Sequence, residues 1–470
     1  MTKPSPSRPP ADDHCGHGRS HIVDSPFFGH SYTTPTSRRI FCDVCRMQRW
    51  LDIEAALALS QAELGMIPQA AADEIARVAR LERIDLGPVS DGIRRSEHAL
   101  VPLLHAIEEA CRGGAGEYLH HGATTQDIID TAQVLEMRDV LDELGAELRS
   151  LVVRLSEVAA EHRDTLMIGR THARPALPTT FGLKVAGWLD ELLRHAERLE
   201  ALRGRVLVAQ LFGGVGTMAG FGDRGRKLLE AFARRLCLGA PRLGWHVARD
   251  RVAEYVVALA MVSATLGRIA DEVRTLSRPE LGEVEEAWRH GKVGSSTMPH
   301  KRNPERLQQV VVLARLTRAN ASLGLEGMLQ EHERDSRGTR LEWLSVPEVS
   351  HFTLAAFAIL GPILLGLRVH RQHMATEARR AAEQLCSEAL MLALGRHLGK
   401  QSAHELVYDL SQAAQSHGSS LRQSLVDRPD IAGLLSPDEL DMIFDPAQHL
   451  GLSGEMVDDA VAGARQWLDR

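Results

Sequence analysis

Apolar residues recur at helical spacing along most of the chain from about Thr36 onward, and strand-like alternation is almost absent. One stripe extends from Val134 to Val158 and predicts a helix of about 35 residues, roughly 50 Å long at 1.5 Å per residue. Comparable patterns occupy later segments at residues 179–208, 248–276, 305–327 and 347–367. Long amphipathic helices need neighbours to cover their apolar faces, so the pattern predicts an all-α protein with a central long-helix bundle.

Changes in pattern divide the chain into a tail and three domains. Residues 1–28 lack periodicity and are rich in Pro, Ser and His, which predicts a disordered N-terminal tail. An N-terminal helical domain is expected at 29–120 and the bundle domain at 121–368. Shorter helices, broken by prolines, predict a C-terminal helical domain at 369–470. The apolar stripes of the bundle helices are broad, so the bundle is expected to pack against the bundles of other copies of the chain.

Composition excludes several classes of protein. The net charge is −7 and the basic residues are dispersed, so nucleic acid is not an expected partner. We expect no membrane span and no secretory signal, and therefore a cytoplasmic protein. The six cysteines are scattered and do not form a disulfide framework. Cys42 and Cys45 form a lone CxxC within a helical pattern at 38–59, and His14, Cys15 and His17 fall in the tail, so no metal site is expected.

The segment from Gly294 to Pro304 holds the most informative candidate chemistry. It reads Gly-Ser-Ser-Thr-Met-Pro-His-Lys-Arg-Asn-Pro and combines a serine pair with a cation and an amide in a mobile loop. A serine alkoxide is too basic to persist at neutral pH, so a serine base needs cations, backbone N–H groups and exclusion of water. These parts suit removal of a proton from carbon with formation of an enolate.

This loop resembles the signature loop of the fumarase/aspartase superfamily nearly residue for residue. The resemblance implies that Ser295 is the base that removes the carbon-bound proton. It also implies that Lys301 and Asn303 bind the substrate carboxylate beside that carbon, with Ser296 in the same substrate site.

The segment from His120 to Thr131 resembles the first conserved region of that superfamily. Thr124 and Asp127 also have the spacing of a capping box at the start of the longest helix. A helix N-terminus presents free N–H groups and a positive dipole end, so Thr124 and Thr125 are expected to hold a substrate carboxylate. His120 matches the histidine of the family in this region.

The segment from Gly169 to Ala176 resembles the region in which these lyases keep a histidine for the leaving group. The resemblance places His172 in that role, with Thr171 as a substrate contact. Glu97-His98 resembles the position of a second histidine in adenylosuccinate lyases, so His98 is expected to orient or charge His172.

Two further motifs invite other functions. The run from Gly213 to Gly216 has no preceding strand and lacks the spacing of a nucleotide loop. It resembles the substrate-side turn of the superfamily, with Gln210 as a polar substrate contact. The charged run from Gln330 to Asp335 lacks HExxH spacing, so no metal is expected there either.

The resemblance extends over about residues 28–452 and implies a cofactor-free, three-domain homotetramer in which three subunits build each active site. Residues 444–451 and 331–334 look like bacterial 3-carboxy-cis,cis-muconate cycloisomerases, whereas His172 favours a lyase. The run at 336–343 departs from the phosphate-binding run of adenylosuccinate lyases.

These features together favour C–N cleavage of a small substituted dicarboxylate, with release of fumarate. The specific hypothesis is nitrosuccinate cleaved to fumarate and nitrite. Three alternatives remain open, namely an adenylosuccinate lyase, a cycloisomerase, and a catalytically silent helical scaffold.

Overall fold

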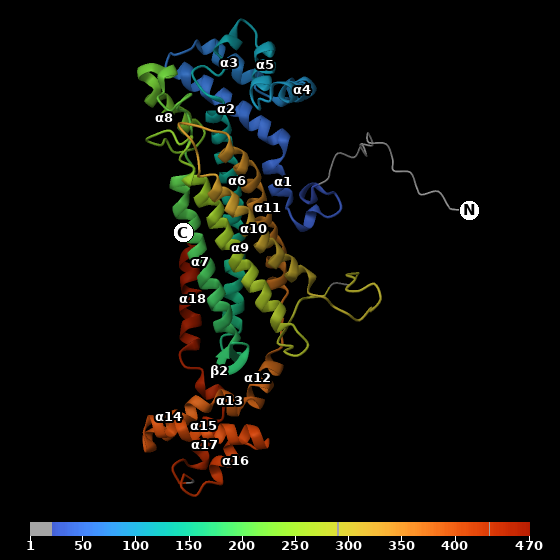
Figure 1. The fold of residues 1–470 in the computed structure, drawn as a ribbon, viewed down its shortest axis with the longest axis vertical. Coiled ribbons are helices and arrows are strands. Elements are labelled where there is room, and N and C mark those ends of the chain that lie inside the picture. Colours follow the sequence, from blue (N-terminus) through green and yellow to red (C-terminus); the bar gives the residue numbers. More distant parts are fainter. Residues whose placement is uncertain (1–20, 289–290, 432) are drawn as a thin grey trace, which may run out of the picture.

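A bundle of long helices forms the middle of the molecule, with smaller groups of helices at its two ends (Figure 1). The computed structural model describes residues 21–288, 291–431 and 433–470. The bundle consists of α6 (Thr125–Glu161), α7 (Phe181–Val206), α9 (Asp250–Leu276), α10 (Glu305–Glu326) and α11 (Arg337–Leu365). All five helices that the apolar pattern predicts are therefore confirmed. Their apolar stripes meet in one continuous core, which explains how a 37-residue helix such as α6 is stabilised along its length.

Helix α11 begins at Arg337, whereas the pattern predicted a start at Pro347. Pro347 and Pro362 both lie inside the helix. A proline removes one backbone hydrogen bond and normally ends a helix. Here the surrounding residues, such as Val346 and Val349, are fully buried against the bundle, and this packing outweighs the local preference.

The N-terminal part of the chain consists of η1 (Ile22–Asp24), η2 (Gly29–Ser31), α1 (Pro35–Phe41), α2 (Asp43–Glu63), α3 (Gln69–Val78), η3 (Leu81–Arg83), α4 (Leu86–Ser96), α5 (Val101–Ala110) and η4 (Ala115–Tyr118). Helices α3, α4 and α5 gather at one end of the bundle, whereas α1 lies along its side against α6 and α11 (Figure 1). Residues 1–20 of the predicted tail, which include His14, Cys15 and His17, lie outside the described residues. Residues 21–28 form η1 and a turn in which the Ser25 hydroxyl accepts the Phe28 N–H at 3.1 Å, so the disorder predicted for them is corrected.

The helical pattern predicted at 38–59 is interrupted at Cys42. This residue has an extended backbone (φ −69°, ψ 145°) and separates α1 from α2. Its sulfur accepts the Cys45 N–H at 3.3 Å and thus caps α2. The lone CxxC therefore marks a helix start rather than a helix interior.

A β-hairpin follows α6, although strand-like alternation is almost absent from the sequence. Strands β1 (Leu166–Thr171) and β2 (Arg174–Thr180) pair in antiparallel fashion. Leu166 and Ile168 are buried against Ala378 and Leu385 of the C-terminal part, which makes the hairpin a bridge to that domain. The remaining short elements beside the bundle are η5 (Ala219–Arg224), α8 (Gly225–Arg235), and the strand pair β3 (Val284–Glu285) and β4 (Arg368–Val369).

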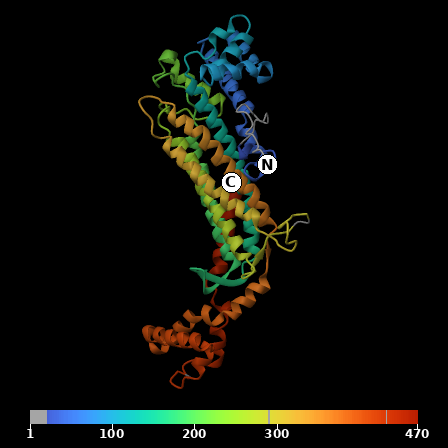
Figure 2. The same cartoon turned by 45° about the vertical axis from the view of Figure 1, so that its right-hand side comes forward.

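The C-terminal helices form a separate group with its own apolar core at the other end of the bundle (Figure 2). They are α12 (Arg371–Arg380), α13 (Ala382–Leu385), α14 (Ser387–Leu398), α15 (Lys400–His417), α16 (Leu421–Val426), α17 (Pro437–Ile443) and η6 (Pro446–His449). The last helix, α18 (Ser453–Leu468), leaves this group and returns along α6 and α7. Val457 and Ala464 join the bundle core, so the predicted domain at 369–470 ends before α18.

Two of the described helices, α9 and α11, are long and apolar enough by composition to cross a membrane. Most of each apolar segment is buried inside the bundle, as in the core helices of a soluble protein. Burial inside the bundle therefore accounts for the apolar composition of α9 and α11.

Candidate active site

The first turn of α6 provides a site suited to an anion. Thr124 is its N-cap residue, and the Asp127 carboxylate accepts the Thr124 N–H at 3.0 Å, as the capping-box spacing predicted. The Thr124 hydroxyl accepts a hydrogen bond from the Arg334 guanidinium at 2.7 Å. Thr125 is the first helical residue. Free N–H groups, a helix dipole and a nearby cation all favour a carboxylate at this position. Its binding by Thr124 and Thr125 stays a prediction.

Asp127 attaches the glycine-rich turn to this helix end. Its buried carboxylate accepts the N–H groups of Phe212 at 3.0 Å and Gly213 at 2.9 Å, and His246 Nε2 lies 2.9 Å away. Gly213 has a φ of +76°, which a residue with a side chain rarely adopts. The glycine run is therefore fixed to the start of α6 by the Asp127 carboxylate.

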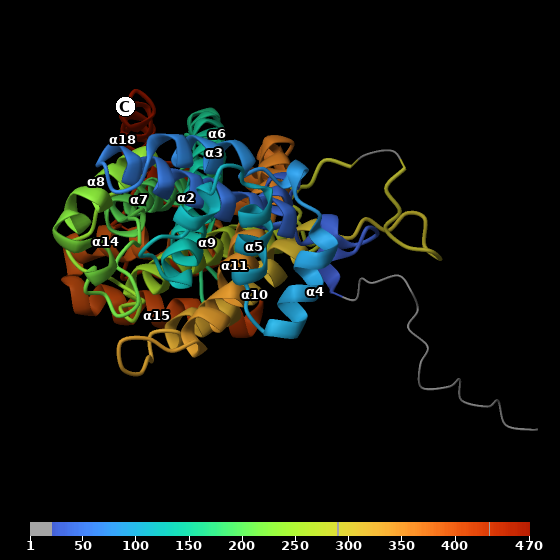
Figure 3. The same cartoon turned by 90° about the horizontal axis from the view of Figure 1, so that it is seen from above.

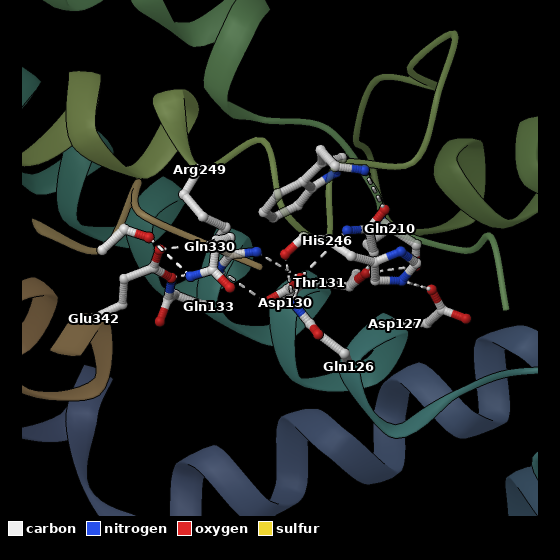
Figure 4. Close-up of polar contacts among 12 residues, drawn as sticks. Gln126, Asp127, Asp130, Thr131, Gln133, Gln210, His246, Arg249, Gln330 and Glu342 are labelled. Carbon is white, nitrogen blue, oxygen red and sulfur yellow. Dashed lines mark hydrogen bonds and ion pairs between the residues drawn. The ribbon is translucent and has the colours of Figure 1, made fainter. Parts of the chain in front are cut away.

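One turn further along α6, a buried ionic network joins three parts of the chain (Figure 4). Arg249 is fully buried and donates two hydrogen bonds to Asp130, at 2.8 and 3.0 Å. It also donates to both carboxylate oxygens of Glu342 on α11, and Gln133 donates to Glu342 at 3.0 Å. The Trp245 ring lies 4.9 Å from the guanidinium carbon. Burial opposes the charge of Arg249, yet the two carboxylates raise its pKa above the ordinary value.

Gln210 belongs to this network rather than to a substrate contact. Its side chain is fully buried, its amide oxygen accepts the Trp245 N–H at 3.0 Å, and its amide nitrogen donates to Asp130 at 3.3 Å. Its backbone exchanges hydrogen bonds with the Thr131 hydroxyl. The predicted substrate contact is corrected, because both ends of the amide are engaged inside the protein (Figure 4).

His98 presents a hydrogen-bond donor to the start of α6. Its Nδ1 accepts the N–H groups of Leu100 at 3.3 Å and Val101 at 3.1 Å. A ring nitrogen that accepts hydrogen bonds carries no proton, so the proton of the neutral ring is on Nε2. Nε2 lies 3.4 Å from the Thr125 hydroxyl. This tautomer aims an N–H group toward the predicted carboxylate site.

A cavity of about 530 Å³ adjoins these groups. Its lining residues come from the α4–α5 connection, the first turns of α6 and the start of α11: Glu97, His98, Ala99, Thr124, Thr125, Gln126, Ile129, Arg334, Asp335, Ser336, Thr339, Arg340 and Trp343. The chain thus brings the predicted residues His98, Thr124 and Thr125 together.

His120 lies behind this site and does not line the cavity. Its Nδ1 is 2.7 Å from a carboxylate oxygen of Glu54, which is buried. Burial disfavours the charged ring, but the hydrogen bond and the charge of Glu54 raise the pKa of His120. The geometry supports a role in holding the segment before α6, and direct contact with substrate stays a prediction.

His172 stands at the tip of the hairpin formed by β1 and β2. Thr171 pairs with Arg174, so His172 and Ala173 form a two-residue turn with φ values of +50° and +63°. Positive φ at both positions is the signature of a tight hairpin turn. The turn is exposed and presents His172 and Thr171 outward from the bundle.

The base of the hairpin is fixed to the segment after α9. Arg170 forms two hydrogen bonds, at 3.0 and 2.8 Å, with the buried carboxylate of Glu283. A second cavity, of about 1120 Å³, lies between the hairpin, α7 and α9, and is lined in part by Ala173 and Lys184. Lys184 is paired with Glu272 at 2.7 Å. The hairpin therefore holds its tip on a rigid support.

The Ser295 loop stands out from the side of the bundle (Figures 1 and 3). The Ser295 oxygen accepts the N–H groups of Thr297 at 3.3 Å and Met298 at 3.0 Å. Backbone donors around a hydroxyl oxygen favour its deprotonated form, which is a requirement for a serine base. Ser296 and Lys301 are exposed on the same loop.

The loop is closed at its base by backbone contacts. Asn303 donates a hydrogen bond to the Gly294 carbonyl at 2.5 Å. A Cβ atom at position 294 would lie 1.9 Å from the Lys301 carbonyl oxygen, so only glycine fits there. Lys292 and Arg302 lie over the Trp288 ring at 4.9 and 5.4 Å. These contacts place Lys301 and Asn303 on the same loop as Ser295, as the sequence predicted.

One chain does not bring the three predicted groups of residues into one site. Helix α6 has 37 residues and is therefore about 55 Å long, with Thr124 before it and His172 after it. The α4–α5 connection and the hairpin accordingly lie at opposite ends of the bundle (Figure 1). The expected contact of His98 with His172 is absent within a chain, because α6 separates them.

Comparisons with known proteins agree over nearly the whole chain. The sequence model of a family described as Lyase matches residues 30–316, and that of the adenylosuccinate lyase C-terminus matches residues 383–460. The chain is 40% identical over 442 residues to N-acetyl-S-(2-succino)cysteine lyase of Dickeya dadantii, covering 94% of this chain and 97% of that protein.

It is also 36% identical to adenylosuccinate lyase of Methanothermobacter thermautotrophicus, covering 93% of this chain and 98% of that protein. Among solved structures, it is similar to 3-carboxy-cis,cis-muconate lactonizing enzyme from Pseudomonas putida, with a TM-score of 0.87, 35% identity, and coverage of 94% of this chain and 100% of that chain.

Proposed function

Because the chain belongs to the fumarase/aspartase superfamily of lyases, we propose that it eliminates a thiol from a 2-substituted succinate and releases fumarate. The proposed substrate is N-acetyl-S-(2-succino)cysteine, the substrate in the name of the Dickeya dadantii relative. The observation that carries the proposed chemistry is the Ser295 oxygen, which two backbone N–H groups surround.

Ser295 is the proposed base in this reaction. Its oxygen takes a proton from the succinate carbon next to the one that bears sulfur. The electron pair left on carbon is delocalised into the adjacent carboxylate, where Lys301 offers a cation. The Asn303 amide donates to the Gly294 carbonyl in this structure and would turn toward the substrate to add a second donor. The N–H groups of Thr297 and Met298 support the anionic serine oxygen before proton transfer.

The second half of the reaction breaks the bond between carbon and sulfur. The electron pair on carbon forms the double bond of fumarate, and the C–S electrons leave with sulfur. The thiolate then takes one proton from a histidine. A thiol has an ordinary pKa of about 8.5, so its thiolate needs less help from an acid than an amine needs. An imidazolium is the acid that this step needs, and His172 offers its exposed ring for that role. The neutral His98 ring offers its Nε2–H as a hydrogen-bond donor to the departing sulfur.

The complete site requires other copies of the chain. We propose a homotetramer in which the start of α6, the hairpin tip and the Ser295 loop come from three subunits. The separation of about 55 Å along α6 supports this arrangement, because no motion within a folded bundle closes such a distance. The exposed positions of His172 and the Ser295 loop suit groups that act in a neighbouring subunit.

The nitrosuccinate hypothesis from the sequence stays as the alternative. It uses the same base and carboxylate contacts, but its leaving group, nitrite, has only three atoms. What supports a thiol over nitrite is the 40% identity to N-acetyl-S-(2-succino)cysteine lyase of Dickeya dadantii. An adenylosuccinate lyase, which also cleaves C–N, and a cycloisomerase are the remaining enzymatic alternatives.

The test is a substrate panel with the purified protein and no added metal or nucleotide. The four compounds are N-acetyl-S-(2-succino)cysteine, nitrosuccinate, adenylosuccinate and 3-carboxy-cis,cis-muconate, with fumarate, free thiol and nitrite all measured. We expect equal amounts of fumarate and thiol from the first compound. Loss of this activity in Ser295→Ala, but not in the exposed control Ser322→Ala on α10, would support the assigned base.

Other outcomes would overturn the proposal in distinct ways. Fumarate with equimolar nitrite would establish the nitrosuccinate reaction instead. Consumption of carboxymuconate without fumarate would indicate a cycloisomerase. A folded protein that converts none of the four compounds would support the catalytically silent scaffold.

A further inference from the structure

One wall of the cavity beside Thr124 is a single face of α11. Ser336, Thr339, Arg340 and Trp343 line it, and their spacing of three, four and seven residues places them on one side of the helix. Ile129 of α6 also lines the cavity. The wall therefore combines hydroxyl groups, one guanidinium and an apolar aromatic surface.

The arginines near this wall differ in their engagement. Arg334 donates to the Thr124 hydroxyl at 2.7 Å and so belongs to the carboxylate site at the start of α6. Arg337 pairs with Asp335 at 2.8 Å and Glu331 at 3.2 Å, and it does not line the cavity. Arg340 forms no ion pair within residues 21–288, 291–431 and 433–470. Of these three cations, Arg340 is the one left to bind a further anionic group.

The succinate part of the substrate already has partners for both of its carboxylates. Thr124 and Thr125 are the proposed partners of one, and Lys301 and Asn303 are those of the other. Arg340 is exposed in the single chain and lines the cavity, so its guanidinium is accessible to a third anionic group. Within the substrate, the leaving group is the part that can carry such a group. A planar guanidinium with several N–H donors matches a carboxylate in both charge and geometry.

We infer that Arg340 is a specificity-determining residue that binds a carboxylate on the leaving group, while Trp343 and Ile129 contact its apolar part. The substrates are therefore succinate adducts of small carboxylic acids that bear a thiol or an amine. This inference rests on the proposed function, since it concerns the leaving group of the same elimination.

The experiment compares two substrates in the intact protein. The first is N-acetyl-S-(2-succino)cysteine, and the second is S-(2-succino)-N-acetylcysteamine, which differs only in lacking the leaving-group carboxylate. We expect Arg340→Met to lower kcat/KM for the first substrate by about 10- to 100-fold, the usual effect of losing a charge-assisted hydrogen bond. For the second substrate we expect a change of less than about twofold. Arg340→Lys, which keeps the charge without the planar fork, should lie between the wild type and Arg340→Met on the first substrate.

Arg337→Met is the matched control, since Arg337 lies on the same helix but does not line the cavity. It should leave the ratio of kcat/KM values for the two substrates unchanged. An equal loss on both substrates in Arg340→Met, or no loss on either, would overturn the specificity role while leaving the proposed function standing. Failure of the wild type to release fumarate from either compound would refute the proposed function and this inference together.

Discussion

The buried network around Arg249 gives a sharp test of how the active-site end of the bundle is stabilised. In Arg249→Met the guanidinium is lost, and Asp130 and Glu342 are left in a region from which water is excluded. Breaking a buried ion pair by removing one partner costs about 3–5 kcal/mol. We expect a loss of this size in the free energy of unfolding at pH 7.

Protonation limits the size of this loss and makes it depend on pH. Burial already raises the pKa of Glu342, although Arg249 opposes that rise. Without Arg249, Glu342 can take up a proton, which costs about 3.4 kcal/mol at pH 7 for a carboxyl with an ordinary pKa of 4.5. At pH 5 the same step costs about 0.7 kcal/mol. A group whose folded-state pKa is raised destabilises the protein as pH rises, so the variant should regain stability between pH 7 and pH 5.

Urea unfolding at a fixed protein concentration, followed by circular dichroism at both pH values, measures this effect. Tyr255→Phe is the control, because it removes a buried hydrogen bond of 2.7 Å between α9 and α11 at Ser350 without removing a charge. We expect it to cost about 1 kcal/mol at both pH values. A loss below about 1 kcal/mol in Arg249→Met, or an equal loss at pH 5 and pH 7, would refute this account of the network.

Three further outcomes follow from the described geometry. Mixing inactive Ser295→Ala and His172→Ala subunits, with exchange verified by mass spectrometry, should restore about a quarter of the sites if different subunits supply the two groups, and no recovery would contradict shared sites. Gly122→Ala should destabilise the fold by about 1–3 kcal/mol in urea unfolding, because φ is +76° and a Cβ atom would lie 2.7 Å from an aromatic ring; a neutral effect would count against this close contact. Glu54→Gln should lower the pKa of His120 in an NMR titration, because the hydrogen bond to Glu54 and its charge raise that pKa. In the wild type, charged His120 stabilises the fold at low pH, and this stabilisation is lost as pH rises through the folded-state pKa; the variant should lack it. An unchanged pKa would refute the assigned pair.

The sequence predicted the features that depend on repetition and on local hydrogen bonds. The five long helices follow from apolar residues at helical spacing, and the start of α6 follows from the capping pair of Thr124 and Asp127. The Ser295 loop was predicted from a serine pair, a lysine and an asparagine in one short segment, a combination that suits catalysis better than a purely structural role. These signals lie within short stretches of chain, so one sequence suffices to detect them.

Other features depend on contacts between distant segments. Pro347 predicted a helix start, but burial of its neighbours carries α11 through it. Gln210 looked like a substrate contact, and only its distance from Asp130 and the Trp245 N–H shows that it is internal. Nothing in the sequence around Arg249 predicts that its side chain is buried. The one hint is that α6 carries acidic residues, such as Asp130, on a helix that is otherwise buried through aliphatic side chains.

The length of α6 has a consequence for when the protein becomes active. In the shared-site arrangement, a newly folded chain carries every reactive group and yet no working site, because α6 holds His98 and Thr124 about 55 Å from His172. Catalysis then begins only when subunits meet, and dilution below the dissociation constant of the assembly switches it off. The length of α6 thereby makes the rate of turnover depend on subunit concentration.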